Sequence, residues 1–71
     1  MRYIVNKYSD DKGRHEVHAE TCSYLPSKEN QIEIGNFFNC KAAILAAKLK
    51  WQDPEYKFDG CYYCCNQCHK G

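Results

Sequence analysis

The sequence lacks any long apolar run. None of its 71 residues falls in a stretch that approaches the ~20 apolar residues of a membrane-spanning helix. Residues 1–7 alternate polar with apolar side chains, so they also lack the apolar segment of a secretory signal peptide. We therefore expect a protein without membrane contact that works in the cytoplasm, where thiols stay reduced.

An excess of charge of one sign is also missing. Ten Lys and Arg stand against nine Asp and Glu, which leaves a formal net charge of +1. Proteins that bind duplex nucleic acid usually carry a strongly positive field, because contacts with phosphates dominate their affinity. We interpret the lysines near the expected helix and the C-terminus first as a solvated surface and second as a phosphate-binding patch; they are Lys41, Lys48, Lys50 and Lys70.

The chain is too short to build a large core. A domain of this size buries only about 60 % of the surface of its unfolded chain, and it usually needs a metal, a disulfide or a partner. Six cysteines are present, and in a reducing compartment clustered cysteines more often bind metal or perform redox chemistry than form stable disulfides. We predict a single zinc-binding domain over residues 1–71.

Four of the six cysteines lie in the last eleven residues, as two adjoining C-x-x-C pairs. Cys61 pairs with Cys64 and Cys65 with Cys68, and this spacing lets two thiolates from one tight turn face the same ion. His18 and Cys22, separated by three residues, can provide the other two ligands. The spacing does not decide which C-x-x-C pair binds. An alternative is that the Cys61–Cys68 cluster performs thiol redox chemistry or metal handling.

The remaining pattern predicts a small α+β domain. Alternating side chains indicate strands at 2–8 and 14–18, joined as a β-hairpin by the turn residues 9–13, and a short third strand at 31–35. Residues 40–50 are rich in Ala, Leu, Ile and Lys and predict a helix.

Further details concern the ends of these elements. Asn39 is the expected N-cap of the helix, and Asp53-Pro54 ends any continuation of it. Residues 55–58 are a possible extended segment, and Asp59-Gly60 is expected to form a turn that delivers Cys61 to a C-terminal knuckle.

Several side chains are expected to have structural roles. We expect Tyr24, Leu25, Phe37 and Phe38 to lie in the core. Cys40 is interpreted as a small buried apolar residue, with a reactive thiol at the helix N-terminus as the alternative. Tyr62 and Tyr63 either shield the metal from water or stack on nucleic-acid bases.

Three segments resemble the metal-binding module at the N-terminus of the Ada methyl-phosphotriester repair protein and related small domains found beside some nucleases. Residues 17–22 resemble the first ligand pair of that module, residues 38–47 its aromatic-plus-helix segment, and residues 58–64 its closing C-x-x-C.

The resemblance implies that the metal ligands are His18, Cys22, Cys61 and Cys64, that the ion is zinc, and that the partner is DNA. The partner expected from all these features is a nucleic acid or a protein. In the Ada module a zinc-bound cysteine at the first ligand position accepts the methyl group. His18 occupies that position here, so we expect an accessory binding domain rather than a methyl acceptor.

Overall fold

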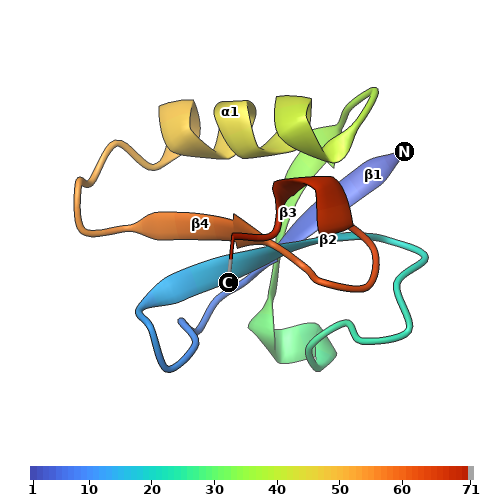
Figure 1. The fold of residues 1–71 in the computed structure, drawn as a ribbon, viewed down its shortest axis with the longest axis horizontal. Helices are drawn as coiled ribbons and strands as arrows, with labels where there is room; N and C mark the ends of the chain where they lie inside the picture. The colour runs from blue at the N-terminus through green and yellow to red at the C-terminus, as the bar shows by residue number, and fades with distance from the viewer. Residues whose placement is uncertain (71) are drawn as a thin grey trace.

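A computed structural model describes residues 1–70 of the chain. It contains a four-stranded sheet, one α-helix and two short 3-10 turns (Figure 1). The strands are β1 (Arg2–Asn6), β2 (Arg14–Ala19), β3 (Gln31–Asn36) and β4 (Lys57–Gly60). The helix and the 3-10 turns are α1 (Cys40–Lys50), η1 (Lys28–Asn30) and η2 (Asn66–Cys68). Within residues 1–70, no helix has the length and apolar character needed to cross a membrane.

The sheet is mixed, with the strand order β3-β1-β2-β4. β1 pairs antiparallel with both β2 and β3, whereas β4 runs parallel to β2. A parallel pair needs a crossover connection, and here β3 and α1 lie between β2 and β4 along the chain. The fold confirms the expected small α+β class.

The β1–β2 hairpin depends on its turn. Gly13 has a φ of 77°, in the region that only glycine enters without strain. The Asp10 side chain accepts hydrogen bonds from the backbone N–H groups of Lys12 and Arg14, each at 2.9 Å. This turn sets the register in which Ile4 faces His18 and Val5 faces Val17.

Helix α1 covers one face of the sheet. Asn39 caps it as predicted, because its side chain accepts a 2.9 Å hydrogen bond from the N–H of Ala42. Small side chains at Ala43 and Ala47 are completely buried and let the helix approach the sheet closely. On the sheet side the core contains Tyr3, Val5, Val17, Ala19 and Ile34.

Two expected core residues lie outside the core. The side chain of Phe38 is 97 % exposed and that of Tyr24 is 58 % exposed. Phe38 precedes the helix and points away from the sheet, and it is Phe37, the residue before it, that packs against the core. Adjacent residues in extended chain point to opposite sides, so only one of two consecutive phenylalanines can face inward.

The expected turn at Asp59-Gly60 is also wrong, because both residues belong to β4. Asp59 pairs with Glu16 and Gly60 with Val17 in the parallel register. The dipeptide is typical of turns when judged locally, but pairing with β2, which is distant in sequence, holds it extended.

Candidate metal centre

Strand β2 and the turn after it place the first two candidate ligands. Val17 and Ala19 point into the core under α1, so alternation turns His18 to the other face of the sheet. After the strand ends, the N–H of Cys22 donates to the carbonyl of Ala19 at 3.0 Å. This tight turn brings the Cys22 thiol back toward the His18 ring.

Strand β4 places the other two. The N–H of Cys61, directly after β4, donates to the carbonyl of Val17 at 3.0 Å. The next residues fold into a knuckle that is closed by a 2.8 Å hydrogen bond from the N–H of Cys65 to the carbonyl of Cys61. The parallel pairing of β2 and β4 therefore brings Cys61 and Cys64 next to His18.

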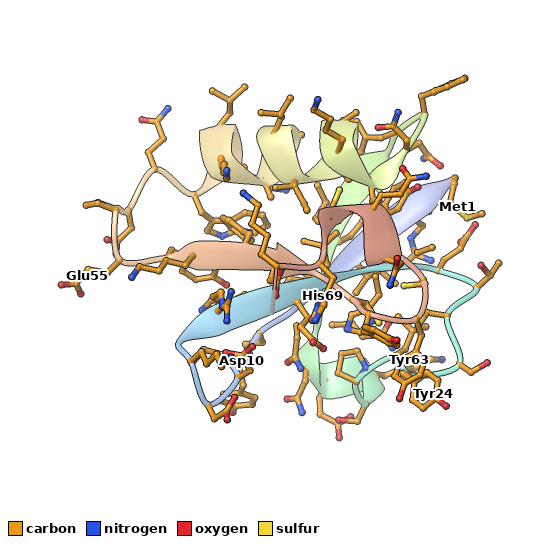
Figure 2. All side chains as sticks on the ribbon, in the orientation of Figure 1. Met1, Asp10, Tyr24, Glu55, Tyr63 and His69 are labelled. Atoms are coloured by element: carbon orange, nitrogen blue, oxygen red, sulfur yellow. The ribbon has the colours of Figure 1, made fainter. Side chains whose placement is uncertain are left out.

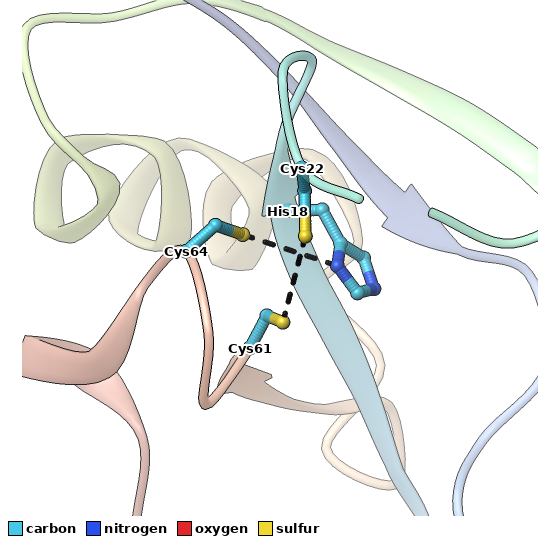
Figure 3. Close-up of side chains that lie close together, drawn as sticks. All are labelled: His18, Cys22, Cys61 and Cys64. Atoms are coloured by element: carbon cyan, nitrogen blue, oxygen red, sulfur yellow. Dashed lines mark hydrogen bonds between the residues drawn. The ribbon is translucent and has the colours of Figure 1, made fainter. Parts of the chain in front are cut away.

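The four side chains form one compact group (Figure 3). The candidate ligand atoms of His18, Cys22, Cys61 and Cys64 all lie within 4.8 Å of one another. Cys22 Sγ is 3.9 Å from Cys61 Sγ, and Cys64 Sγ is 4.0 Å from His18 Nδ1. A tetrahedron with sulfur at about 2.3 Å from a zinc ion has corners about 3.8 Å apart. The spacing therefore fits a tetrahedral ion with three thiolates and one imidazole.

Groups around the cluster orient it and favour negative charge on sulfur. The N–H of Ala19 donates to Cys64 Sγ at 3.3 Å, and the N–H of Tyr24 donates to Cys22 Sγ at 3.4 Å. On the other side of the His18 ring, Nε2 lies 3.7 Å from Glu16 Oε1. A carboxylate facing the second nitrogen of a ligating histidine fixes its orientation and raises its basicity.

Burial sets the protonation of these groups when no cation is present. Burial raises the pKa of the Cys64 thiol to about 12, and the nearby Cys22 and Cys61 add to the rise. Burial lowers the pKa of His18, which favours the neutral imidazole that binds metals. Three crowded thiolates are thus unfavourable on their own, and a bound dication would supply the compensating charge.

The structure brings together all four residues named from the sequence, and it separates them from the other cysteines. Cys61 and Cys64 face His18 and Cys22, so this C-x-x-C pair, rather than the Cys65/Cys68 pair, belongs to the group. Among the described residues no second such group of His, Cys, Asp and Glu occurs. That the four residues ligate an ion stays a prediction.

Two residues with no predicted part in the site hold the knuckle in place. The buried carboxylate of Asp59 accepts a 2.7 Å hydrogen bond from the N–H of Lys70, and its second oxygen lies 3.5 Å from His69 Nδ1. Gly60 is in close contact with the backbone carbonyl of Cys65 and with Cys68, which leaves no room for a Cβ atom. Their dipeptide was interpreted as a turn, and only the long-range contacts of β4 reveal its role.

The tyrosines of the knuckle are largely exposed. Tyr62 is 57 % exposed and Tyr63 64 % exposed. Tyr63 stacks on Tyr24 with ring centroids 3.9 Å apart, and the pair lies at the edge of the molecule (Figure 2). The stack joins the loop that contains Cys22 to the knuckle that contains Cys64, so it clamps the two halves of the site together.

Comparisons with protein-family models, curated proteins and solved structures find no match to this chain. The function therefore has to be inferred from the site itself.

Proposed function

We propose that this chain is a zinc-stabilised binding module in which one structural zinc ion joins the β2 turn to the C-terminal knuckle. The observation that carries the proposal is the group formed by His18, Cys22, Cys61 and Cys64. Four ligands fill the coordination shell of zinc and leave no open position for a substrate or an activated water, which is typical of structural rather than catalytic sites.

The donor set favours zinc over other ions. Calcium and magnesium prefer oxygen ligands, and this group offers three sulfur atoms and one nitrogen. A tetrahedral Cys₃His set is common among structural zinc sites. When bound, the ion would supply a cross-link between segments that are far apart in the sequence, because Cys22 and Cys61 are 39 positions apart.

Removal of the metal tests this role. Structural zinc contributes on the order of 10 kcal/mol to the folding of small domains, and a core of this size cannot replace it. A strong chelator should abolish the helical circular dichroism signal, and added zinc should restore it. An unchanged spectrum after complete removal of zinc would contradict a structural role.

For the partner, we propose a single-stranded nucleic acid. A hollow of about 580 Å³ lies between α1, β4 and the C-terminal residues, and it is lined by the cations Arg14, Lys48, Lys57 and Lys70. Asp53 is the one acidic residue among those that line it. This concentration of positive charge supports binding of phosphates, although the whole chain carries only +1. Aromatic side chains at the same hollow, Trp51 and Tyr56, support contacts with unpaired bases.

Salt dependence tests the partner. Fluorescence anisotropy with a labelled single-stranded oligonucleotide should show binding at low salt that weakens as salt rises, by a slope of about 0.7 per phosphate contact. Lys57→Gln should reduce the slope, whereas the matched Lys28→Gln, in η1 and away from the hollow, should not. Absence of binding at low salt would contradict the nucleic-acid partner and leave a protein as the partner of the module.

The resemblance to the Ada module supports the same ligands and the same class of partner. Because His18 stands where that module has its methyl-accepting cysteine, we propose binding without methyl transfer. A methylated phosphotriester oligonucleotide should therefore leave the mass of the protein unchanged.

A further inference from the structure

Two cysteines outside the candidate metal centre lie next to each other. Cys40 Sγ, in the first turn of α1, is 3.3 Å from Cys68 Sγ, at the end of η2. The two residues are 28 positions apart in the sequence and meet because the knuckle docks against the helix. The other member of the second C-x-x-C pair, Cys65, is almost fully buried, and its sulfur lies 4.0 Å from Cys64 Sγ.

The two thiols differ in access to solvent. Cys40 is 8 % exposed, whereas Cys68 is half-buried and lines a hollow of about 310 Å³. Three lysines, Lys41, Lys48 and Lys70, line the same hollow, and no acidic residue is among its lining residues. A reagent in this hollow would meet Cys68 first, with Cys40 directly behind it.

We propose that Cys68 and Cys40 form a thiol–disulfide exchange site that reacts with small anionic disulfides of the glutathione type. Cys68 is the attacking thiol and Cys40 the resolving thiol. The lysines around the hollow attract the carboxylates of the reagent. This site is separate from the proposed zinc ion and does not depend on it for its chemistry.

The reaction balances as two exchanges. Cys68 loses its proton and attacks one sulfur of the small disulfide, which breaks the S–S bond and releases one thiol. Cys40 then loses its proton and attacks Cys68 Sγ, which releases the second thiol and leaves a Cys40–Cys68 disulfide. Two protein thiols are oxidised and the small disulfide is reduced to two thiols. The sulfurs need to approach by only about 1.3 Å to reach bonding distance.

Mapping of thiols in the zinc-loaded wild-type protein tests the proposal. The protein is incubated with defined ratios of oxidised to reduced glutathione, alkylated, and analysed by native mass spectrometry and by peptide mapping. We expect the loss of two hydrogen atoms per chain, a single Cys40–Cys68 disulfide, and retention of one zinc. A pairing that involves Cys65, or no disulfide even in oxidised glutathione alone, would overturn it.

The same spectra separate this inference from the proposed function. Absence of zinc in the untreated protein would refute the structural site and leave the exchange result standing, whereas loss of zinc only on oxidation would show that the metal ligands, rather than Cys40 and Cys68, are oxidised.

Single substitutions assign the order of attack. In Cys40→Ser the reaction should stop at a mixed disulfide between Cys68 and one glutathione. In Cys68→Ser, Cys40 should stay reduced, because it is buried. A glutathione adduct on Cys40 in Cys68→Ser would overturn the assigned order. The wild-type map stays decisive if either variant does not fold.

Reagents of different charge test the role of the lysines. At low salt the exchange rate with oxidised glutathione should exceed that with the neutral hydroxyethyl disulfide, once each is corrected for its rate with a free thiol. Lys48→Gln should reduce the glutathione rate about threefold and leave the neutral reagent unaffected, with Lys28→Gln as the matched control. Equal effects on both reagents would overturn the anionic class of ligand.

Discussion

At the residue scale, His18 is the member of the candidate metal centre that most distinguishes one hypothesis from another. It is 2 % exposed, and its two ring nitrogens face Cys64 and Glu16. A buried histidine in an ordinary core needs no sulfur neighbours, whereas one that faces three thiols matches a ligand. The other two histidines have different surroundings: His15 stacks on Tyr56 and His69 bonds to the carbonyl of Gly60.

His18→Ala should weaken zinc binding by more than about 100-fold, because even the outer partners of ligands are worth 10–100-fold. His18→Cys should retain one zinc, since four thiolates also form a structural site. The matched control is His15→Ala, which removes an imidazole of the same strand. Competition with a chromophoric chelator measures all three. Equal affinities for His18→Ala and the control would remove His18 from the ligand set.

The sequence was sufficient to name these four residues, because the spacings His18-x₃-Cys22 and Cys61-x₂-Cys64 are local signals of ligand pairs. Which C-x-x-C pair faces His18 was not predictable from spacing, since both pairs have the same one. The pairing of Cys40 with Cys68 was also missed, because it depends on how the knuckle docks against α1.

At the element scale, helix α1 and strand β4 show what local sequence does and does not determine. The bounds of α1, 40–50, agree with the prediction, because its propensity and its Asn39 cap are properties of neighbouring residues. β4 was only partly predicted, because its pairing with β2 joins residues far apart in the chain. That pairing positions Cys61, so the least local element determines the site.

Gly60 at the end of β4 should not tolerate a side chain. An added Cβ atom would lie 2.6 Å from the carbonyl oxygen of Cys65 and 2.7 Å from Cys68 Cβ. We expect Gly60→Ala to lower the free energy of unfolding by about 1–3 kcal/mol, measured by urea denaturation of the zinc-loaded protein. Gln67→Ala, on the exposed side of η2, is the control. If the two variants are equally stable, the knuckle does not pack on Gly60 as described.

Oxidation should also act on an element, by tying η2 to the first turn of α1. A disulfide between residues 28 positions apart stabilises a fold by about 3–4 kcal/mol when it introduces no strain. Thermal unfolding of the oxidised wild-type protein should therefore occur at a higher temperature than that of the reduced protein. The Cys40→Ser variant should show no such increase, and a lower unfolding temperature after oxidation would contradict the close approach of the two thiols.

At the scale of the whole molecule, stability should fall in acid. Burial lowers the pKa of His18, so below its ordinary value of about 6.5 the unfolded chain binds a proton more readily than the folded one. The contribution of neutral His18 is complete above about pH 6.5 and is lost as the pH falls through the lowered value. Protons also displace zinc from thiolates, which adds in the same direction.

Urea unfolding between about pH 7.5 and pH 5 measures this effect, with released zinc followed by an indicator dye. We expect the free energy of unfolding and the bound zinc to fall together. A stability that stays constant over this range would contradict both the buried neutral imidazole and the metal centre.

The whole fold has few other means of holding its C-terminal part. The knuckle contacts the sheet through Gly60 and Asp59 and the helix through Cys68, and its tyrosines are exposed. A cross-link among His18, Cys22, Cys61 and Cys64 would connect these segments at one point, and a small core makes such a connection necessary.

The most direct measurement is native mass spectrometry of the protein purified without added metal, compared with its mass after denaturation under non-reducing conditions. We predict one zinc ion per chain in the native spectrum and six free thiols after denaturation. A native mass without metal, together with a disulfide among Cys22, Cys61 and Cys64, would contradict the structural metal centre.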